Sequence, residues 1–204
     1  MPLPDPSTLF GPIDIYLFDQ ILRGRIRPGM RILDAGCGSG RNLVYLLQAG
    51  YDVTAVDADP AAIAAVAALA ARLAPQLPAS NFIAAPLEVM PVEDEGYDAV
   101  ISSAVLHFAR DDRQFDAMLS GTWRAVKRGG LLFCRLASTI GLETRVRRID
   151  GRRFQLPDGS DRYLVDEQML LDRGDQMGGM LLDPLKTTVV QDQRSMTTWV
   201  LRKA

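Results

Sequence analysis

The chain has 204 residues, of which 48% are hydrophobic and 24% are charged. This composition is that of an ordinary globular domain, and it excludes a disordered chain, a collagen-like repeat and a coiled coil. The 23 basic and 25 acidic residues leave a formal net charge of -2, so no broad positive field exists to attract nucleic acid or anionic lipid. We therefore expect neither nucleic acid nor a membrane as a partner.

The chain also lacks the sequence marks of export and of metal binding. Its first residues, MPLPDPSTLFG, have neither the basic region nor the apolar region of a secretory signal. The most apolar stretch, Ala61 to Ala71, is shorter than the about 20 residues that span a bilayer. Cys37 and Cys134 lie far apart and outside any CxxC or Cys/His spacing, which predicts no disulfide and no metal site. These features favour a cytoplasmic protein.

Strand and helix patterns alternate through the first two thirds of the chain, after an apolar stretch over 9–22 that resembles an amphipathic helix. The predicted strands are 30–33, 51–56, 81–85, 97–102 and 130–136. The predicted helices are 41–48, one that opens at Asp59-Pro60, and 112–126. Such alternation is typical of an α/β fold with a doubly wound, mostly parallel sheet and helices on both faces. Ligands of these sheets bind at the carboxyl ends of the strands.

The last third of the chain departs from this alternation. A helix is predicted over 166–175, and two β-rich runs, 181–190 and 195–202, predict a C-terminal antiparallel hairpin. Between core and tail, Asp158-Gly159 suits a tight turn in a segment that we interpret as a lid. We predict one domain over 1–204. Its parts are an N-terminal lid helix region (1–27), a cofactor-binding core (28–137), an insertion or lid (138–165), and a helix with a β-hairpin (166–204).

The segment ILDAGCGSGRN places a glycine-rich loop directly between a predicted strand and a predicted helix. Glycines let the backbone turn sharply and approach a ligand closely, and the helix start offers free N–H donors. A dinucleotide fingerprint would need a third glycine where Arg41 stands, so a pyrophosphate site is disfavoured. Asp57 ends the next strand, where a carboxylate can accept two hydrogen bonds from ribose hydroxyls.

Four motifs in order, DAGCGSG, VDADP, GYDAVISSAVLHF and VKRGGLLF, resemble the class I methyltransferases that use S-adenosylmethionine, over roughly residues 30 to 136. The resemblance implies that fold, a seven-stranded sheet closed by an antiparallel hairpin, and S-adenosylmethionine as cofactor, with S-adenosylhomocysteine as product. The stretch GRNLVYLLQAGYDVTAVD is also similar to the tellurite-resistance methyltransferases. That second match concerns the cofactor side and hardly identifies the acceptor.

The resemblance implies roles for individual residues on the cofactor side. Asp34 would order the loop and lie near the cofactor's ammonium group, and Asp57 would bind the ribose hydroxyls. The family often has an acidic residue where this chain has Pro86, so the Leu87 N–H and the Glu88 carboxylate are the candidates for the adenine. Cys37 has the alternative of being a small buried filler. The predicted cofactor-binding set is Asp34, Gly36, Cys37, Gly38, Gly40, Asp57, Ala58, Leu87, Glu88 and Ser102.

Methyl transfer from a sulfonium needs chiefly an acceptor held in line and water kept out. His107 is the only histidine, and it follows the fourth predicted strand, so it is a candidate general base or acceptor contact. Its alternative is a structural hydrogen bond. Tyr16 is a second catalytic candidate, with core packing as its alternative. The segment Ser102-Ser103 lacks the motif of amino-directed DNA methyltransferases, which argues against base methylation.

Five arginines crowd into the predicted lid, and guanidinium groups suit the recognition of an anionic acceptor. They are Arg145, Arg147, Arg148, Arg152 and Arg153. Their alternative is pairing with nearby acids such as Asp158. Arg194, near the last strand, has the same two interpretations.

The sequence thus favours an S-adenosylmethionine-dependent methyltransferase that acts on a small, possibly anionic molecule by in-line displacement. Two alternatives remain at this stage, a NAD-dependent oxidoreductase and a non-catalytic cofactor-binding module. The oligomeric state is not predicted.

Overall fold

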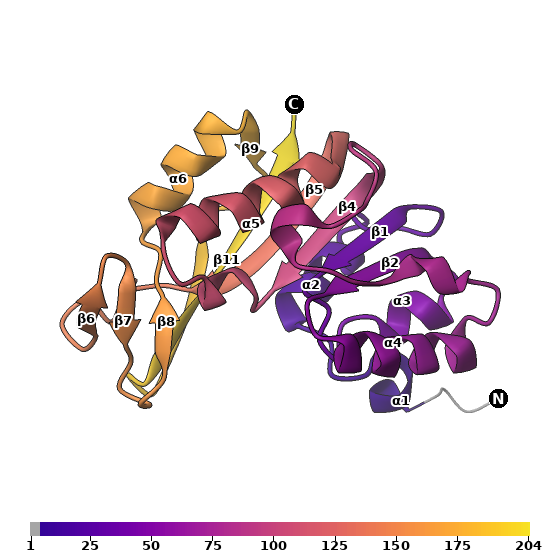
Figure 1. Ribbon diagram of the computed structural model, residues 1–204, viewed down its shortest axis with the longest axis horizontal. Helices are drawn as coiled ribbons and strands as arrows, with labels where there is room; N and C mark the ends of the chain where they lie inside the picture. The colour runs from indigo at the N-terminus through magenta and orange to yellow at the C-terminus, as the bar shows by residue number, and fades with distance from the viewer. Residues whose placement is uncertain (1–4) are drawn as a thin grey trace.

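The computed structural model describes residues 5–204, and its central layer is a twisted, mostly parallel sheet (Figure 1). The strand order is β10-β11-β5-β4-β1-β2-β3, with β9 also paired to β11. The strands are β1 (Arg31–Ala35), β2 (Asp52–Asp57), β3 (Phe82–Ala84), β4 (Tyr97–Ser103), β5 (Val126–Ala137), β9 (Gly179–Leu181), β10 (Lys186–Val190) and β11 (Arg194–Lys203). Strands β1 to β5 pair in parallel, whereas β11 pairs with β5, β9 and β10 in antiparallel fashion. The predicted fold class and closing hairpin are confirmed, and β9 adds an eighth strand to the seven predicted.

Helices cover both faces of this sheet, because each central strand is apolar on both sides. Leu33 of β1 packs in a buried cluster with residues of α5 (Asp112–Ala125) and α6 (Glu167–Gln176). Its neighbour Ile32 packs on the opposite face with residues of α2 (Ile15–Leu22), α3 (Val44–Gln48) and α4 (Pro60–Leu73). Among residues 5–204, no helix combines the length and the apolarity needed to cross a bilayer.

The N-terminal region differs from the single amphipathic helix that the apolar pattern over 9–22 predicts. Helix α1 (Pro6–Phe10) ends at Gly11, which has a φ of 61°, and α2 begins only at Ile15. A Cβ on Gly11 would lie 2.8 Å from Val44 Cγ2 of α3, so the bend lets α1 pack closely against α3. Pro12, directly after the bend, cannot donate a backbone hydrogen bond to continue a helix. The prediction of one continuous helix is wrong for this reason.

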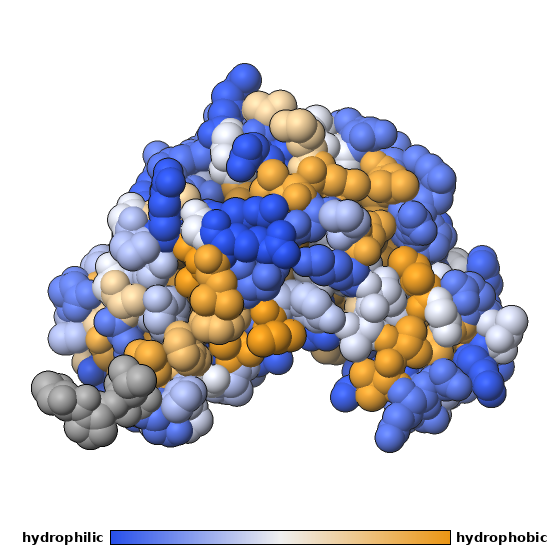
Figure 2. All heavy atoms as spheres, turned by 180° about the vertical axis from the view of Figure 1, so that it is seen from behind, coloured by the Kyte–Doolittle hydropathy of each residue, from blue (hydrophilic) through white to orange (hydrophobic). Residues whose placement is uncertain are grey.

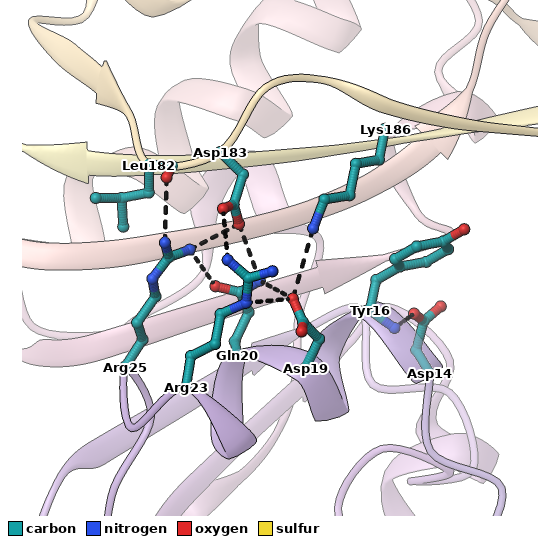
Figure 3. A network of polar contacts seen from close by, with 9 residues as sticks. All are labelled: Asp14, Tyr16, Asp19, Gln20, Arg23, Arg25, Leu182, Asp183 and Lys186. Atoms are coloured by element: carbon teal, nitrogen blue, oxygen red, sulfur yellow. Dashed lines mark hydrogen bonds and ion pairs between the residues drawn. The ribbon is translucent and has the colours of Figure 1, made fainter.

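The predicted strand over 181–190 is also divided, at Asp183-Pro184, into β9 and β10. Asp183, between these strands, and Lys186, at the start of β10, bind α2 and the residues just after it. We call this polar network the clamp, and its residues are Asp19, Gln20, Arg23, Arg25, Asp183 and Lys186 (Figure 3). The Asp183 carboxylate accepts from Arg25 at 2.6 Å, from Gln20 at 3.1 Å and from Arg23 at 3.2 Å. The clamp therefore fixes the N-terminal helix to the far end of the chain.

The segment predicted as a lid forms a small antiparallel sheet of β6 (Arg147–Asp150), β7 (Arg153–Gln155) and β8 (Asp161–Tyr163), beside the main sheet (Figure 1). Between β7 and β8 the Leu156 N–H donates to the Ser160 carbonyl at 2.8 Å, and Gly159 has a φ of 84°. The tight turn expected at Asp158-Gly159 is confirmed. This hairpin lies beside the turn between β10 and β11, to which an Arg145–Asp192 ion pair of 3.6 Å connects the lid segment.

Candidate active site

The glycine-rich loop leaves β1 at the carboxyl edge of the sheet and turns back under β2. The Gly36 and Cys37 N–H groups donate to the Val56 carbonyl at 2.8 and 3.0 Å. Gly36 has a φ of 86°, and a Cβ there would lie 2.4 Å from Val105, in the turn after β4. Any larger residue would push these segments apart. A Cβ on Gly38 would instead meet open space, which leaves the backbone accessible to a ligand.

A cavity of about 390 Å³ opens over this loop, and we call it the loop cavity. It is lined by Gly36, Cys37, Gly38, Ser39, Arg41, Asn42, Asp57, Ser103, Ala104, Val105 and Phe108. Four predicted cofactor-binding residues are among these. The Asp57 carboxylate accepts from the Gly38 N–H at 2.8 Å and from the Asp59 N–H at 3.0 Å, so it also holds the loop in shape.

Asp34 lies at the end of β1 and is 1% exposed, yet neither of its carboxylate oxygens has a hydrogen-bond partner among residues 5–204. Burial raises the pKa of the Asp34 carboxyl to about 7; the charge of Arg41 opposes this rise and that of Asp57 adds to it. A buried carboxylate without a partner is costly in free energy. A cationic group bound beside the loop would supply the partner that the chain itself does not.

The other predicted cofactor-binding residues do not line the loop cavity. Gly40 is buried, and a Cβ there would lie 3.1 Å from Val66, so this glycine allows α4 to approach the loop. Ala58 is exposed, and Ser102 is buried within β4. Leu87 and Glu88 lie in the short helix η2 (Leu87–Val89), where Glu88 accepts from Gln114 at 2.8 Å. Their roles toward a cofactor stay predictions.

A second cavity of about 360 Å³, which we call the arginine cavity, adjoins the first. Its lining residues are Arg41, Ala104, His107, Arg135, Ala137, Leu156, Asp158, Ser160, Arg162, Val190, Arg194 and Met196. Arg41 and Ala104 line both cavities, so the two share a wall. Figure 2 shows this edge of the molecule hollowed between the lid strands and the N-terminal helices.

The arginine cavity has a surplus of positive charge, with four guanidinium groups and one carboxylate in its lining. Asp14, buried at the start of α2, pairs with Arg135 at 2.8 Å and approaches Arg41 at 3.7 Å. Arg162 and Arg194 have no carboxylate within 4.0 Å in the described part of the chain; Arg162 instead lies 4.9 Å from the ring centroid of Phe108. This surplus favours an anionic occupant.

Ala104 stands at the meeting point of the two cavities with a φ of 65°, in the left-handed region that residues with a side chain seldom adopt. The strained turn leads from β4 into the short helix η3 (Leu106–Phe108), which carries His107 into the lining of the arginine cavity. Tyr16 lines neither cavity. Its hydroxyl pairs with Thr188 at 2.7 Å, and its ring lies under Arg135, which favours a supporting role over a catalytic one.

The five arginines clustered over 145–153 of the lid do not line the arginine cavity, whereas Arg162, further along the same segment, does. Arg152 pairs with Asp166 at 2.8 Å, Arg145 pairs with Asp192, and Arg147 binds Gln155. The arginines that do line it, apart from Arg194, were not among the predicted acceptor contacts. The position of Arg41, directly after the glycine loop, could have indicated that it lies near the site. Nothing in the sequence alone indicates this for Arg135 or Arg162.

Comparison with known proteins agrees with this geometry. The family described as methyltransferase domain matches residues 33–134. The chain belongs to this family. It is 33% identical over 139 residues to the uncharacterized methyltransferase YodH of Bacillus subtilis, a match that covers 68% of this chain and 51% of YodH. The chain spans about half the length of the curated relatives it matches.

Solved structures share the fold over nearly the whole chain. A 1,6-didemethyltoxoflavin-N1-methyltransferase of Burkholderia thailandensis, solved with S-adenosylhomocysteine bound, has a TM-score of 0.65 at 18% identity and covers 100% of this chain and 92% of its own. A TehB-like methyltransferase of Corynebacterium glutamicum has a TM-score of 0.62 at 22% identity, with 94% and 89% covered. The predicted class I methyltransferase is thus confirmed, and S-adenosylmethionine is the cofactor of that class.

Proposed function

We propose that this protein transfers a methyl group from S-adenosylmethionine to a small anionic molecule, with the cofactor in the loop cavity and the acceptor in the arginine cavity. The observation that carries the proposal is the shared wall of the two cavities. Behind the glycine loop that lines one cavity lies the buried carboxylate of Asp34, and in the lining of the other cavity lie the guanidinium groups of Arg162 and Arg194; none of these three has an ion-pair partner among residues 5–204. The two sides therefore suit a cation and an anion held next to each other.

On the cofactor side, Asp34 would pair with the ammonium group, and the open backbone at Gly38 would lie against the nucleoside. Asp57 would accept hydrogen bonds from the ribose hydroxyls with the oxygen lone pairs that the loop leaves free. The bound cofactor supplies an electrophilic methyl group on sulfur. The chain's own task is to align the acceptor with that methyl group and to exclude water.

On the acceptor side, the cavity volume of about 360 Å³ and the hairpin that bounds it support a small molecule as the methyl acceptor. The lid role of this hairpin rests on Asp158, Ser160 and Arg162, which it contributes to the cavity lining. A cytoplasmic location and the absence of nucleic-acid and membrane partners remain predictions from the sequence.

Calorimetric titration tests the cofactor assignment. We expect S-adenosylhomocysteine to bind and NAD not to bind. Asp57→Ala should weaken binding by roughly 1.5 to 3 kcal/mol for each hydrogen bond lost. Asp175→Ala, an exposed carboxylate of α6, is the matched control and should leave binding unchanged. Binding of NAD alone would contradict the proposal and favour an oxidoreductase.

Methyl transfer itself is tested with cofactor labelled on its methyl group and a metabolite extract separated by charge. We expect the label in products of the anionic fraction. Tight cofactor binding with no labelled product from any fraction would favour a non-catalytic binding module. Label only in products of neutral or cationic molecules would reject the anionic acceptor.

A further inference from the structure

The ring of His107 has one nitrogen committed to the protein backbone. The residue is 6% exposed, and its Nδ1 accepts a hydrogen bond from the Ala137 N–H at 3.2 Å. A nitrogen that accepts a hydrogen bond cannot carry a proton, so the neutral ring bears its proton on Nε2. That nitrogen has no partner in residues 5–204 and is not sealed from solvent, and His107 lines the arginine cavity. The ring therefore offers a donor to whatever the cavity holds.

Burial, together with the charge of Arg162, keeps the ring neutral. Arg41, Arg135, Arg162 and Arg194 come from the glycine loop, β5, β8 and β11, and Asp158 comes from the lid turn. Burial lowers the pKa of His107 to about 4, and the charge of Arg162 acts in the same direction. The ring is thus uncharged across the physiological range, and it cannot take up a proton without losing the bond to the backbone of β5.

Besides His107, Asp158 is the lining residue whose side chain could accept a proton. It is equally unsuited to act as a base. One of its carboxylate oxygens accepts from the Ser160 hydroxyl at 2.6 Å and from the Ser160 N–H at 2.9 Å. These bonds, with the charges of Arg162 and Arg194, hold the pKa of Asp158 below its ordinary value. The lining of the arginine cavity therefore contains no group that would remove a proton from an acceptor near neutral pH.

We infer that His107 acts as a hydrogen-bond donor to the acceptor and not as a general base, and that the acceptor enters with its reacting atom already ionised, as the oxygen of a carboxylate or another oxyanion. The inference rests on the proposed function. An oxygen lone pair forms the new bond to the methyl carbon, the carbon–sulfur bond breaks, and its electron pair returns the sulfur to a neutral thioether. An anion and a cation become two neutral groups, and no proton leaves the acceptor.

The first test needs no substrate, because His107 is the only histidine in the chain. Nitrogen-15 NMR of the labelled protein reads both ring nitrogens directly. We expect the neutral form with the proton on Nε2 at every pH between 5.5 and 8.5. A proton on Nδ1, or a titration midpoint between 6 and 7.5, would overturn the inference whether or not the protein is a methyltransferase.

The second test uses defined probes on the protein saturated with S-adenosylhomocysteine. Benzoate, succinate and selenite are titrated, with benzamide and benzyl alcohol as neutral counterparts. We expect at least one anion to bind and to shift the Nε2 signal, and neither neutral compound to do so. Binding of the neutral compounds alone, or of no probe at all, would overturn the acceptor class. Failure of S-adenosylhomocysteine to bind would instead count against the proposed function. The assignment of the His107 tautomer would still be tested by the NMR measurement alone.

Two variants separate a donor from a structural histidine. His107→Gln retains an N–H near the position of Nε2, whereas His107→Phe removes it. We expect the Phe variant to bind the anionic probe about 10-fold more weakly and the Gln variant to remain within about 3-fold of the wild type. Both should bind S-adenosylhomocysteine as the wild type does, which controls for folding. Equal anion affinity in all three proteins would overturn the donor role.

Once an acceptor is found, the pH profile of turnover gives a further check. We expect kcat/KM to be flat from pH 6.5 to 9. A rising limb with a midpoint between 6 and 7.5 that disappears in His107→Gln would show a base at this position and overturn the inference.

Discussion

The clamp between α2 and β10 and the arginine cavity use the same residue types in opposite ways. In the clamp, Arg23 and Arg25 pair with Asp183 within 3.2 Å (Figure 3). In the cavity, Arg162 and Arg194 line an open space, and the one carboxylate of that lining binds Ser160. Charge that is paired within the chain stabilises the fold, and charge that the chain leaves unpaired is available to a ligand.

The buried acids show the same contrast. Burial alone would raise the pKa of Asp183, yet hydrogen bonds from Arg25 and Gln20 hold that pKa below its ordinary value. Burial raises the pKa of Asp34 to about 7, because the opposing charge of Arg41 is not enough to offset it. One carboxylate is thus kept ionised by the protein, whereas the other needs a bound cation to be kept so.

The largest effect is expected in the arginine cavity. Replacing both Arg162 and Arg194 with Gln should lower kcat/KM for the anionic acceptor more than 100-fold, because each charged hydrogen bond is worth about 1.5 to 3 kcal/mol. Stability in urea should change by less than about 0.5 kcal/mol. Arg128→Gln, at an exposed arginine with a side chain 81% accessible, is the matched control. A large loss of stability in the double variant would assign these arginines to the fold instead.

The second prediction concerns Asp34 in the cofactor-free protein. Because its pKa is raised in the folded state, folding binds a proton between pH 4 and 7, and stability contributed by this group falls as the pH rises through that range. From pH 5 to 8 the wild type should lose about 3 kcal/mol of unfolding free energy relative to Asp34→Asn. Urea unfolding at the two pH values measures this difference. Parallel pH dependences in the two proteins would contradict the raised pKa.

The third prediction breaks the clamp. Asp183→Asn removes the negative charge and one of the two oxygens that accept from Arg25, Gln20 and Arg23. It should destabilise the protein by about 2 kcal/mol at pH 7, less than the loss of a fully buried pair because Arg23 is half exposed. Since the pKa of Asp183 is lowered by folding, this stabilisation is present above the unfolded pKa and is lost as the pH falls through the folded value. The difference between variant and wild type should therefore shrink in acid, while anion binding stays unchanged.

The smallest effect concerns the pH dependence of S-adenosylhomocysteine binding. A cation bound beside Asp34 favours its ionised form, so the affinity for S-adenosylhomocysteine should rise about tenfold from pH 6 to 8 and then level off. Calorimetry in buffers of different ionisation enthalpy should also show proton release at pH 6.5. In Asp34→Asn, affinity should be weaker and nearly independent of pH; an unchanged profile would remove Asp34 from the cofactor site.

Local patterns were enough to predict most of the fold. The strand that ends at Asp57, the glycine loop and the turn at Asp158-Gly159 are each set by residues adjacent in sequence, and each appears where the pattern indicates. The helix break at Gly11 and the division of the last strands at Pro184 were missed, because the apolar pattern continues across both. At both positions, a residue that breaks a helix or strand outweighs the periodic pattern of apolar residues.

The acceptor side could not be predicted in the same way. Arg41, Arg135, Arg162 and Arg194 meet only because the lid and the last hairpin fold over the end of the sheet. The spacing of these arginines in the sequence does not indicate that they line one cavity. The crowded lid arginines gave the stronger sequence signal and turned out to be bound elsewhere, with Arg152 and Arg145 held by Asp166 and Asp192.

The stacking of Arg162 on Phe108 connects the loop cavity with the arginine cavity. Phe108 lines the loop cavity, and Arg162, which lies over its ring, belongs to β8 and lines the arginine cavity. Under the proposed function, a nucleoside in the loop cavity would contact this ring and restrict the guanidinium before the acceptor binds. Catalysis on this scaffold should follow a compulsory sequence, with the methyl donor first to enter and its spent form last to leave.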